Sequence, residues 1–109
     1  MELAFETRAL RTLCEEDDVA AEKLPGEVVD ALKRRLADLH AADSVLDLVV
    51  GRPDFDSTAP LVRMTLAANY VLTCAANHRT CPLQAAGAVD WQRVRRLKIL
   101  TIERSESDA

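Results

Sequence analysis

The chain has 109 residues, of which 49% are hydrophobic, and it carries a formal net charge of −4. This length suits one domain with a single core, and the hydrophobic fraction argues against a chain that is disordered throughout. The negative charge argues against a protein whose main partner is nucleic acid, because such affinity comes largely from cations that neutralise phosphates. We expect one domain over residues 1–109, with a disordered polar tail at 104–109.

Three features of the sequence bear on its compartment. The start of the chain has Glu2 and no long apolar run, which is not the pattern of an export signal. No stretch reaches the roughly 18–20 apolar residues of a membrane span. The three cysteines, Cys14, Cys74 and Cys81, are odd in number and lack the spacing of a disulfide framework. We therefore expect a cytoplasmic protein with reduced thiols and no membrane contact.

The first part of the chain predicts a strand and two helices. Apolar and other residues alternate over 1–6, which suits a short strand. Thr7 can cap a helix over 8–14, and the acidic run 15–18 is expected to end it and to connect it to the next helix. That second helix begins within 23–27, with Pro25 in its first turn, and continues to about residue 42. Apolar residues recur along it at intervals of three and four.

The middle of the chain predicts a loop and then a hairpin. The loop covers 43–58 and contains a short turn at 45–48. Two strands are expected at 62–66 and 70–75, with Asn69 suited to a positive φ in the turn between them.

The last part predicts a second loop, a short turn and a closing strand. The loop covers 77–89, Asp90 can cap the turn at 91–94, and apolar residues predict a strand at 97–102. The element order is β-α-α-β-β-β. This is an α+β pattern, in which two N-terminal helices pack on one face of a mostly antiparallel sheet.

Five stretches, in this order, resemble one family. They are MELAFETRALRTLCE, PGEVVDALKRRLADLHAADSVLDL, VGRP, NYVL followed by AANH, and VDWQRVRRLKILTIE. Over about residues 1–103 the chain resembles the HigB/RelE-like host-killing toxins, also called plasmid maintenance system killer proteins. The resemblance implies a RelE/ParE-like fold, with two N-terminal helices against a curved antiparallel sheet.

The resemblance also implies a function. Toxins of this family belong to type II toxin–antitoxin systems and act as small ribonucleases that cut messenger RNA, usually on the ribosome. A cognate antitoxin encoded beside the toxin silences it. The chemistry uses no metal and no cofactor. Basic side chains on the concave face of the sheet hold the phosphate, activate the 2′-hydroxyl and stabilise the oxyanion.

The sequence departs from the family where that chemistry lies. Members typically read GYRLVF at the hairpin, whereas this chain reads NYVLTC, so that Val71 stands at the position of the expected arginine. The preceding loop usually carries Arg, Lys or His, but here it reads DSTAPL. The acidic-Tyr-His ending is replaced by ERSESDA. Loss of the arginine alone would lower a cleavage rate by about 10²–10⁴.

Two residues are candidates for the missing catalytic groups. Arg63, on the first hairpin strand, is expected on the same face as Thr65, Val71 and Thr73, where its guanidinium could bind a phosphate. His78 is the only histidine near this face and is the candidate general base. The alternative for His78 is a histidine with no role beyond its loop.

Three cations are candidates for RNA binding: Arg79, Arg96 and Lys98. The alternative is that the basic run from Arg93 to Lys98 forms a solvated strand edge or an antitoxin contact. Cys74, His78 and Cys81 could supply three zinc ligands, but a fourth is not evident and the spacing matches no standard finger, so no metal site is expected.

Three functions therefore remain open from the sequence. The first is a toxin that cleaves RNA through a rebuilt site. The second is a catalytically silent module that keeps the fold and binds an antitoxin. The third is a toxin that acts on another target, as the gyrase-poisoning relatives of this superfamily do. Val71, the DSTAPL loop and the altered ending favour the second and third functions.

Overall fold

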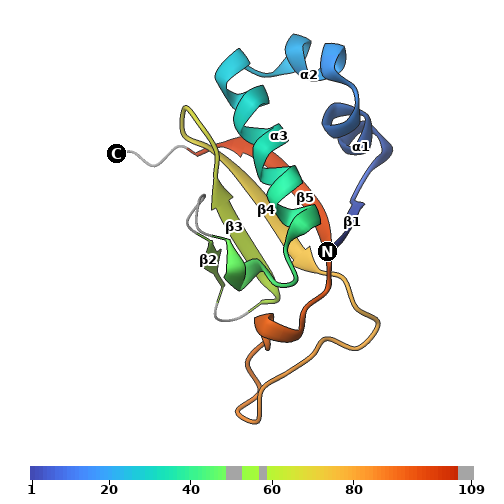
Figure 1. Cartoon of the computed structure of the whole chain (residues 1–109), viewed down its shortest axis with the longest axis vertical. Coiled ribbons are helices and arrows are strands. Elements are labelled where there is room, and N and C mark those ends of the chain that lie inside the picture. Colours follow the sequence, from blue (N-terminus) through green and yellow to red (C-terminus); the bar gives the residue numbers. More distant parts are fainter. Residues whose placement is uncertain (49–52, 57–58, 106–109) are drawn as a thin grey trace.

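The computed structural model describes residues 1–48, 53–56 and 59–105. In these residues the chain is an α+β protein in which three helices accompany a five-stranded mixed sheet (Figure 1). The elements, in chain order, are β1 (Glu2–Phe5), α1 (Arg8–Glu15), α2 (Asp17–Lys23), α3 (Gly26–Ala41), the 3₁₀ turn η1 (Val45–Asp47), β2 (Asp54–Phe55), β3 (Leu61–Thr65), β4 (Tyr70–Ala76), the 3₁₀ turn η2 (Trp91–Arg93) and β5 (Arg96–Arg104).

The N-terminal elements confirm the predicted strand and first helix. The Thr7 hydroxyl accepts a hydrogen bond from the Leu10 N–H at 3.1 Å and caps α1. The acidic run ends α1 at Glu15 as predicted, but the prediction that the rest of the run is only a connection is wrong. Asp17 and Asp18 open a further helix, α2, because their carboxylates lie in its first turn, where the helix dipole favours negative charge.

The core lies between α3 and one face of the sheet (Figure 1). The prediction that Pro25 lies in the first turn of this helix is wrong, because Pro25 immediately precedes the helix. The apolar stripe of α3 is buried as its three-and-four spacing predicts. The buried residues of this stripe are Val28, Val29, Leu32, Leu36 and Leu39. All of them except Val29 belong to the core cluster, which also includes Val62, Met64, Leu72, Cys74, Leu97 and Ile99.

The strands follow the order β1-β5-β4-β3-β2, and β1 is parallel to β5 while the other pairs are antiparallel. The predicted hairpin is confirmed, with Asn69 at φ 65° in its turn. The sequence missed β2, which lies inside the predicted loop 43–58. The remainder of that loop at 49–52 and 57–58 lies outside the described residues.

The predicted tail is wrong at its start. β5 continues to Arg104, and the Ser105 N–H donates to the Asn69 carbonyl at 2.6 Å. Residues 106–109 lie outside the described part of the chain.

Residues 77–95, between β4 and β5, form a projection that we call the arm (Figure 1, orange). A bridge between Leu83 and Val89 and a turn with Gly87 at φ 93° fold it back on itself. The predicted capping role of Asp90 is wrong. Its carboxylate makes no cap bond and instead accepts from the Arg93 Nε–H at 2.8 Å.

Ser44 joins η1 to the base of the arm and yields a first prediction. Its hydroxyl is fully buried, donates to the Trp91 carbonyl at 2.9 Å and accepts from the Leu46 N–H at 3.1 Å. Ser44→Ala leaves these groups unpaired, so we expect the free energy of unfolding to fall by about 1–3 kcal/mol in urea titrations. The exposed Thr80 is the control, and Thr80→Ala should change the free energy of unfolding by less than about 0.5 kcal/mol. An equal loss in both variants would contradict this role of Ser44.

Candidate functional site

The face of the sheet opposite α3, which we call the open face, carries the predicted site. On β3, β4 and β5 the residues that alternate with the buried core positions lie on it. The register aligns them in three rows across these strands: Leu61, Ala75 and Lys98; Arg63, Thr73 and Thr101; Thr65, Val71 and Glu103. The predicted placement of Arg63 and Val71 on one face is thus confirmed.

Each cation that the described residues place on the open face lies beside a carboxylate. Arg63 Nη1 lies 3.7 Å from Asp56 Oδ2, and the register also places Asp54 directly opposite Arg63. At the other edge of the sheet, β1 supplies the acids. Arg96 Nε lies 3.6 Å from Glu2, and Lys98 Nζ lies 3.6 Å from Glu6.

Among the described residues, acids outnumber bases on this face. The bases are Arg63, Arg96 and Lys98, and the acids are Glu2, Glu6, Asp54, Asp56 and Glu103. Exposed ion pairs stabilise a fold by less than about 1 kcal/mol, so these pairs matter little for folding. They matter for binding, because a phosphate approaching any of the three cations also meets a carboxylate.

Val71 lies between Thr65 on β3 and Glu103 on β5. Its half-buried side chain supplies apolar surface at the position where the family resemblance places an arginine. The hydroxyls nearest to it come from threonines, which remain protonated near neutral pH and are therefore poor general bases. Position 71 itself therefore adds no positive charge to the open face.

His78 does not face Arg63. It lies five residues beyond Thr73, the cross-strand partner of Arg63, which corresponds to roughly 15 Å of extended chain. Its Nε2 accepts a hydrogen bond from the Arg95 N–H at 2.9 Å, so that atom is occupied by the backbone at the base of the arm. This bond assigns the neutral ring a proton on Nδ1.

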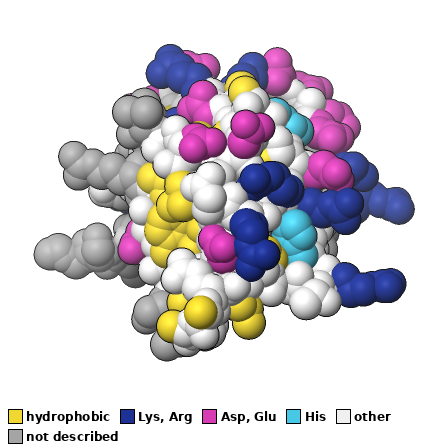
Figure 2. All heavy atoms as spheres, turned by 60° about the horizontal axis from the view of Figure 1, so that its bottom comes forward, with side chains coloured by type: hydrophobic (Ala, Val, Ile, Leu, Met, Phe, Trp, Pro, Cys, Tyr) yellow, Lys and Arg dark blue, Asp and Glu magenta, His cyan; other side chains and the backbone are white. Residues whose placement is uncertain are grey.

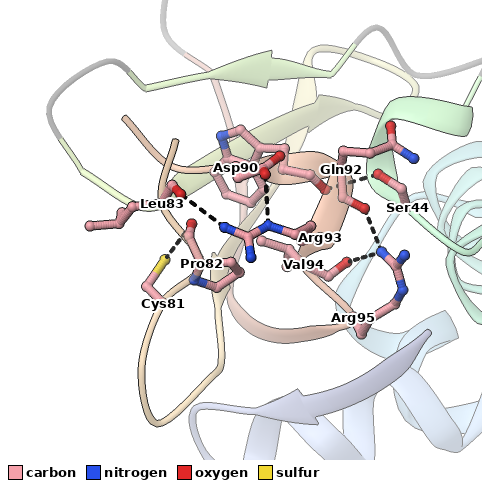
Figure 3. A network of polar contacts seen from close by, with 10 residues as sticks. Ser44, Cys81, Pro82, Leu83, Asp90, Gln92, Arg93, Val94 and Arg95 are labelled. Carbon is pink, nitrogen blue, oxygen red and sulfur yellow. Dashed lines mark hydrogen bonds and ion pairs between the residues drawn. The ribbon is translucent and has the colours of Figure 1, made fainter. Parts of the chain in front are cut away.

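The arginines of the arm hold the arm together (Figure 3). Arg93 donates from Nε to Asp90 and from Nη2 to the Leu83 carbonyl at 2.9 Å. Arg95 donates from Nη1 to the carbonyls of Gln92 and Val94. Arg79 is exposed in the arm, beyond the end of β4 at Ala76. The structure therefore divides the predicted RNA-binding residues between the arm and the edge of the open face.

The three cysteines differ in their surroundings. Burial, with a smaller effect of Glu15, raises the pKa of Cys14 to about 11, and burial together with the nearby Cys14 raises that of Cys74 to about 12. Cys81 is partly exposed and donates weakly to the Pro82 carbonyl at 3.8 Å. No group of three or more His, Cys, Asp or Glu in the described residues could hold a metal ion.

These thiols give a second prediction. Iodoacetamide should modify Cys81 first and Cys74 last, because the thiolate is the reactive form and Cys74 is both buried and protonated. Mass spectrometry of partly alkylated protein gives the order.

The raised pKa values of Cys14 and Cys74 also make the stability of the fold depend on pH. The folded state favours the protonated thiols, and this contribution to stability is fully present below pH 9.0 and is lost as pH rises toward 11–12. The urea midpoint should fall over that range, and by less in Cys74→Ala. A midpoint that is constant above pH 9.0 would contradict it.

Sequence reasoning found the cations of the site but missed the acids that face them. Glu2 and Glu6 precede Arg96 and Lys98 by more than ninety residues, and only the parallel pairing of β1 with β5 brings them together. Asp54 and Asp56 were assigned to a loop. The alternation of Glu2 and Glu6 with apolar residues was the signal that could have indicated an acidic edge.

No protein-family model, characterised protein or solved structure matches this chain. None of the helices in the described residues is long and apolar enough to cross a membrane.

Proposed function

We propose that this chain is the toxin-type member of a type II toxin–antitoxin pair, with a RelE-like fold and a cytoplasmic location. Support comes from the five sequence stretches that resemble the HigB/RelE-like toxins. Further support comes from the element order, in which a strand and helices precede an antiparallel β3-β4-β5 sheet with one uncovered face. The expected partner is a protein antitoxin.

We further propose that this chain does not cleave RNA as its relatives do and acts by binding. The observation that carries this proposal is the charge of the open face. Among the described residues, five carboxylates stand against three cations there, and Val71 occupies the expected arginine position. A transition state with extra negative charge on its phosphoryl oxygens is disfavoured on such a surface. A toxin with a non-RNA target, such as gyrase, is compatible with the same face.

Two experiments test these proposals separately. The chain is expressed alone in a bacterial host, and growth, translation and cleavage of messenger RNA are followed. We expect uninterrupted growth and no cleavage. Arrest with cleavage that is lost in Arg63→Ala would establish an active nuclease, whereas arrest that survives this substitution without cleavage would indicate another target.

In the second experiment, the product of the neighbouring reading frame is co-expressed with this chain, and co-elution of the two proteins in gel filtration is expected. Failure to co-elute would contradict the antitoxin pair.

A further inference from the structure

Beside the arm lies a hollow, a surface feature separate from the open face. It has a volume of about 540 Å³ and lies between the arm, β2 and the residues just before β3. Its floor is formed by Phe55 and Trp91, whose rings are 5.0 Å apart and tilted by 47°. Leu83, Val89 and Cys81 of the arm line one side, and Pro60 lines another.

The side chains of this hollow are unusual for a protein surface. Leu83 is 50% exposed and is one of two large hydrophobic residues that the described part of the chain leaves exposed. Space-filling Figure 2 shows hydrophobic side chains gathered on one side of this end of the molecule. Apolar surface gathered around a hollow favours an anchor side chain from a partner.

Several contacts join the two sides of the arm. The Leu83–Val89 bridge and the His78–Arg95 bond hold its two sides together. The Arg93 bonds to Asp90 and Leu83 do the same (Figure 3). The Asp90 N–H also donates to the Pro82 carbonyl at 2.8 Å. A surface that is already ordered loses little conformational entropy on binding, which favours affinity.

The charge of the arm bears on which partner would suit the hollow. Residues 77–95 contain three arginines and one aspartate, a formal charge of +2 in a chain whose total is −4. Figure 2 shows a group of Lys and Arg side chains on the same end as the hydrophobic group. The hollow itself is lined mainly by apolar residues, and its carboxylate, Asp56, is engaged with Arg63. An aromatic base is a poor occupant, because Trp91 is only 8% exposed and offers little ring surface for stacking.

We propose that the hollow and the arm bind an acidic segment of a partner protein through one large apolar anchor residue. The anchor enters the hollow beside Leu83 and Val89. Flanking carboxylates of the partner lie near the arm arginines, of which Arg79 alone makes no side-chain hydrogen bond or ion pair with the described residues. This inference uses the arm and not the open face, so it stands independently of the toxin proposal.

The test uses the full chain and labelled short peptides in which one Leu, Phe or Trp is flanked by Glu and Asp. Saturable binding is expected by fluorescence anisotropy. In ¹⁵N NMR spectra the shifts should fall on arm amides and on the indole N–H of Trp91, the single tryptophan. Leu83→Glu should weaken binding by about tenfold to a hundredfold, because it removes apolar contact and adds a repelling charge. Arg79→Gln should weaken it several-fold and reduce its dependence on salt.

Leu46 provides a matched control. It is 49% exposed, nearly the same as Leu83, but it does not line the hollow, so Leu46→Glu should leave binding unchanged. Peptides without the apolar residue should not bind. Absence of saturable binding, or equal losses in both Leu→Glu variants, would overturn the proposal.

Two other occupants give distinct results. Single-stranded RNA whose binding survives Leu83→Glu but is lost in Arg79→Gln would assign the arm to nucleic acid and overturn the proposal. A concentration-dependent dimer in analytical ultracentrifugation that Leu83→Glu dissociates would assign the hollow to a second copy and would also overturn it.

Discussion

The double variant Val71→Arg, Glu103→Gln is expected to cleave RNA at least about a hundredfold faster than the parent chain. Position 71 lies on the open face, one strand away from Arg63, so two guanidiniums would then approach one phosphate. Glu103 must be changed as well, because it lies directly across from position 71 and would pair with the new arginine. The measurement is cleavage of a defined messenger RNA in the presence of ribosomes.

The matched control is Val71→Met, Glu103→Gln, which changes the charge at position 103 in the same way but adds no guanidinium. It should cleave no faster than the parent. Equal rates in the two double variants would mean that the missing arginine is not what silences this face. Activity of the parent at the level of the arginine variant would contradict the proposed loss of catalysis.

Leu39→Ala is expected to lower the free energy of unfolding by about 2–5 kcal/mol. Leu39 is fully buried on α3, which covers the core face of the sheet. The substitution removes apolar contacts and leaves a cavity that the surrounding strands cannot close completely. Since small domains are stable by only about 5–15 kcal/mol, this loss is a large fraction of the total. Urea unfolding followed by circular dichroism measures it.

Leu46→Ala is the control with the same chemical change at an exposed position. It should change the free energy of unfolding by less than about 0.5 kcal/mol. A loss at position 39 no larger than that at position 46 would mean that α3 does not pack on the sheet as described.

Elements with strong local signals could be predicted from the sequence. The apolar stripe of α3, the Thr7 cap and the alternation on β3 and β4 each depend on side chains within a few residues. The acidic run 15–18 was misinterpreted because the same residues suit both a solvated connection and a helix N-terminus. β2 was missed because two residues are too few to show an alternation, and the strand exists only through its pairing with β3.

The candidate site likewise has features that the sequence predicts and features that only the fold decides. The sequence by itself determined the α+β class, the absence of an arginine at Val71 and the presence of Arg63 on the hairpin face, since a period of two fixes which residues of a strand share a face. Only the tertiary structure decided the charge of that face. The acids of β1 meet the cations of β5 through a parallel pairing of distant segments, and local sequence carries no information on which strands become neighbours. The same holds for the hollow, because Phe55 and Trp91 meet only when the chain folds.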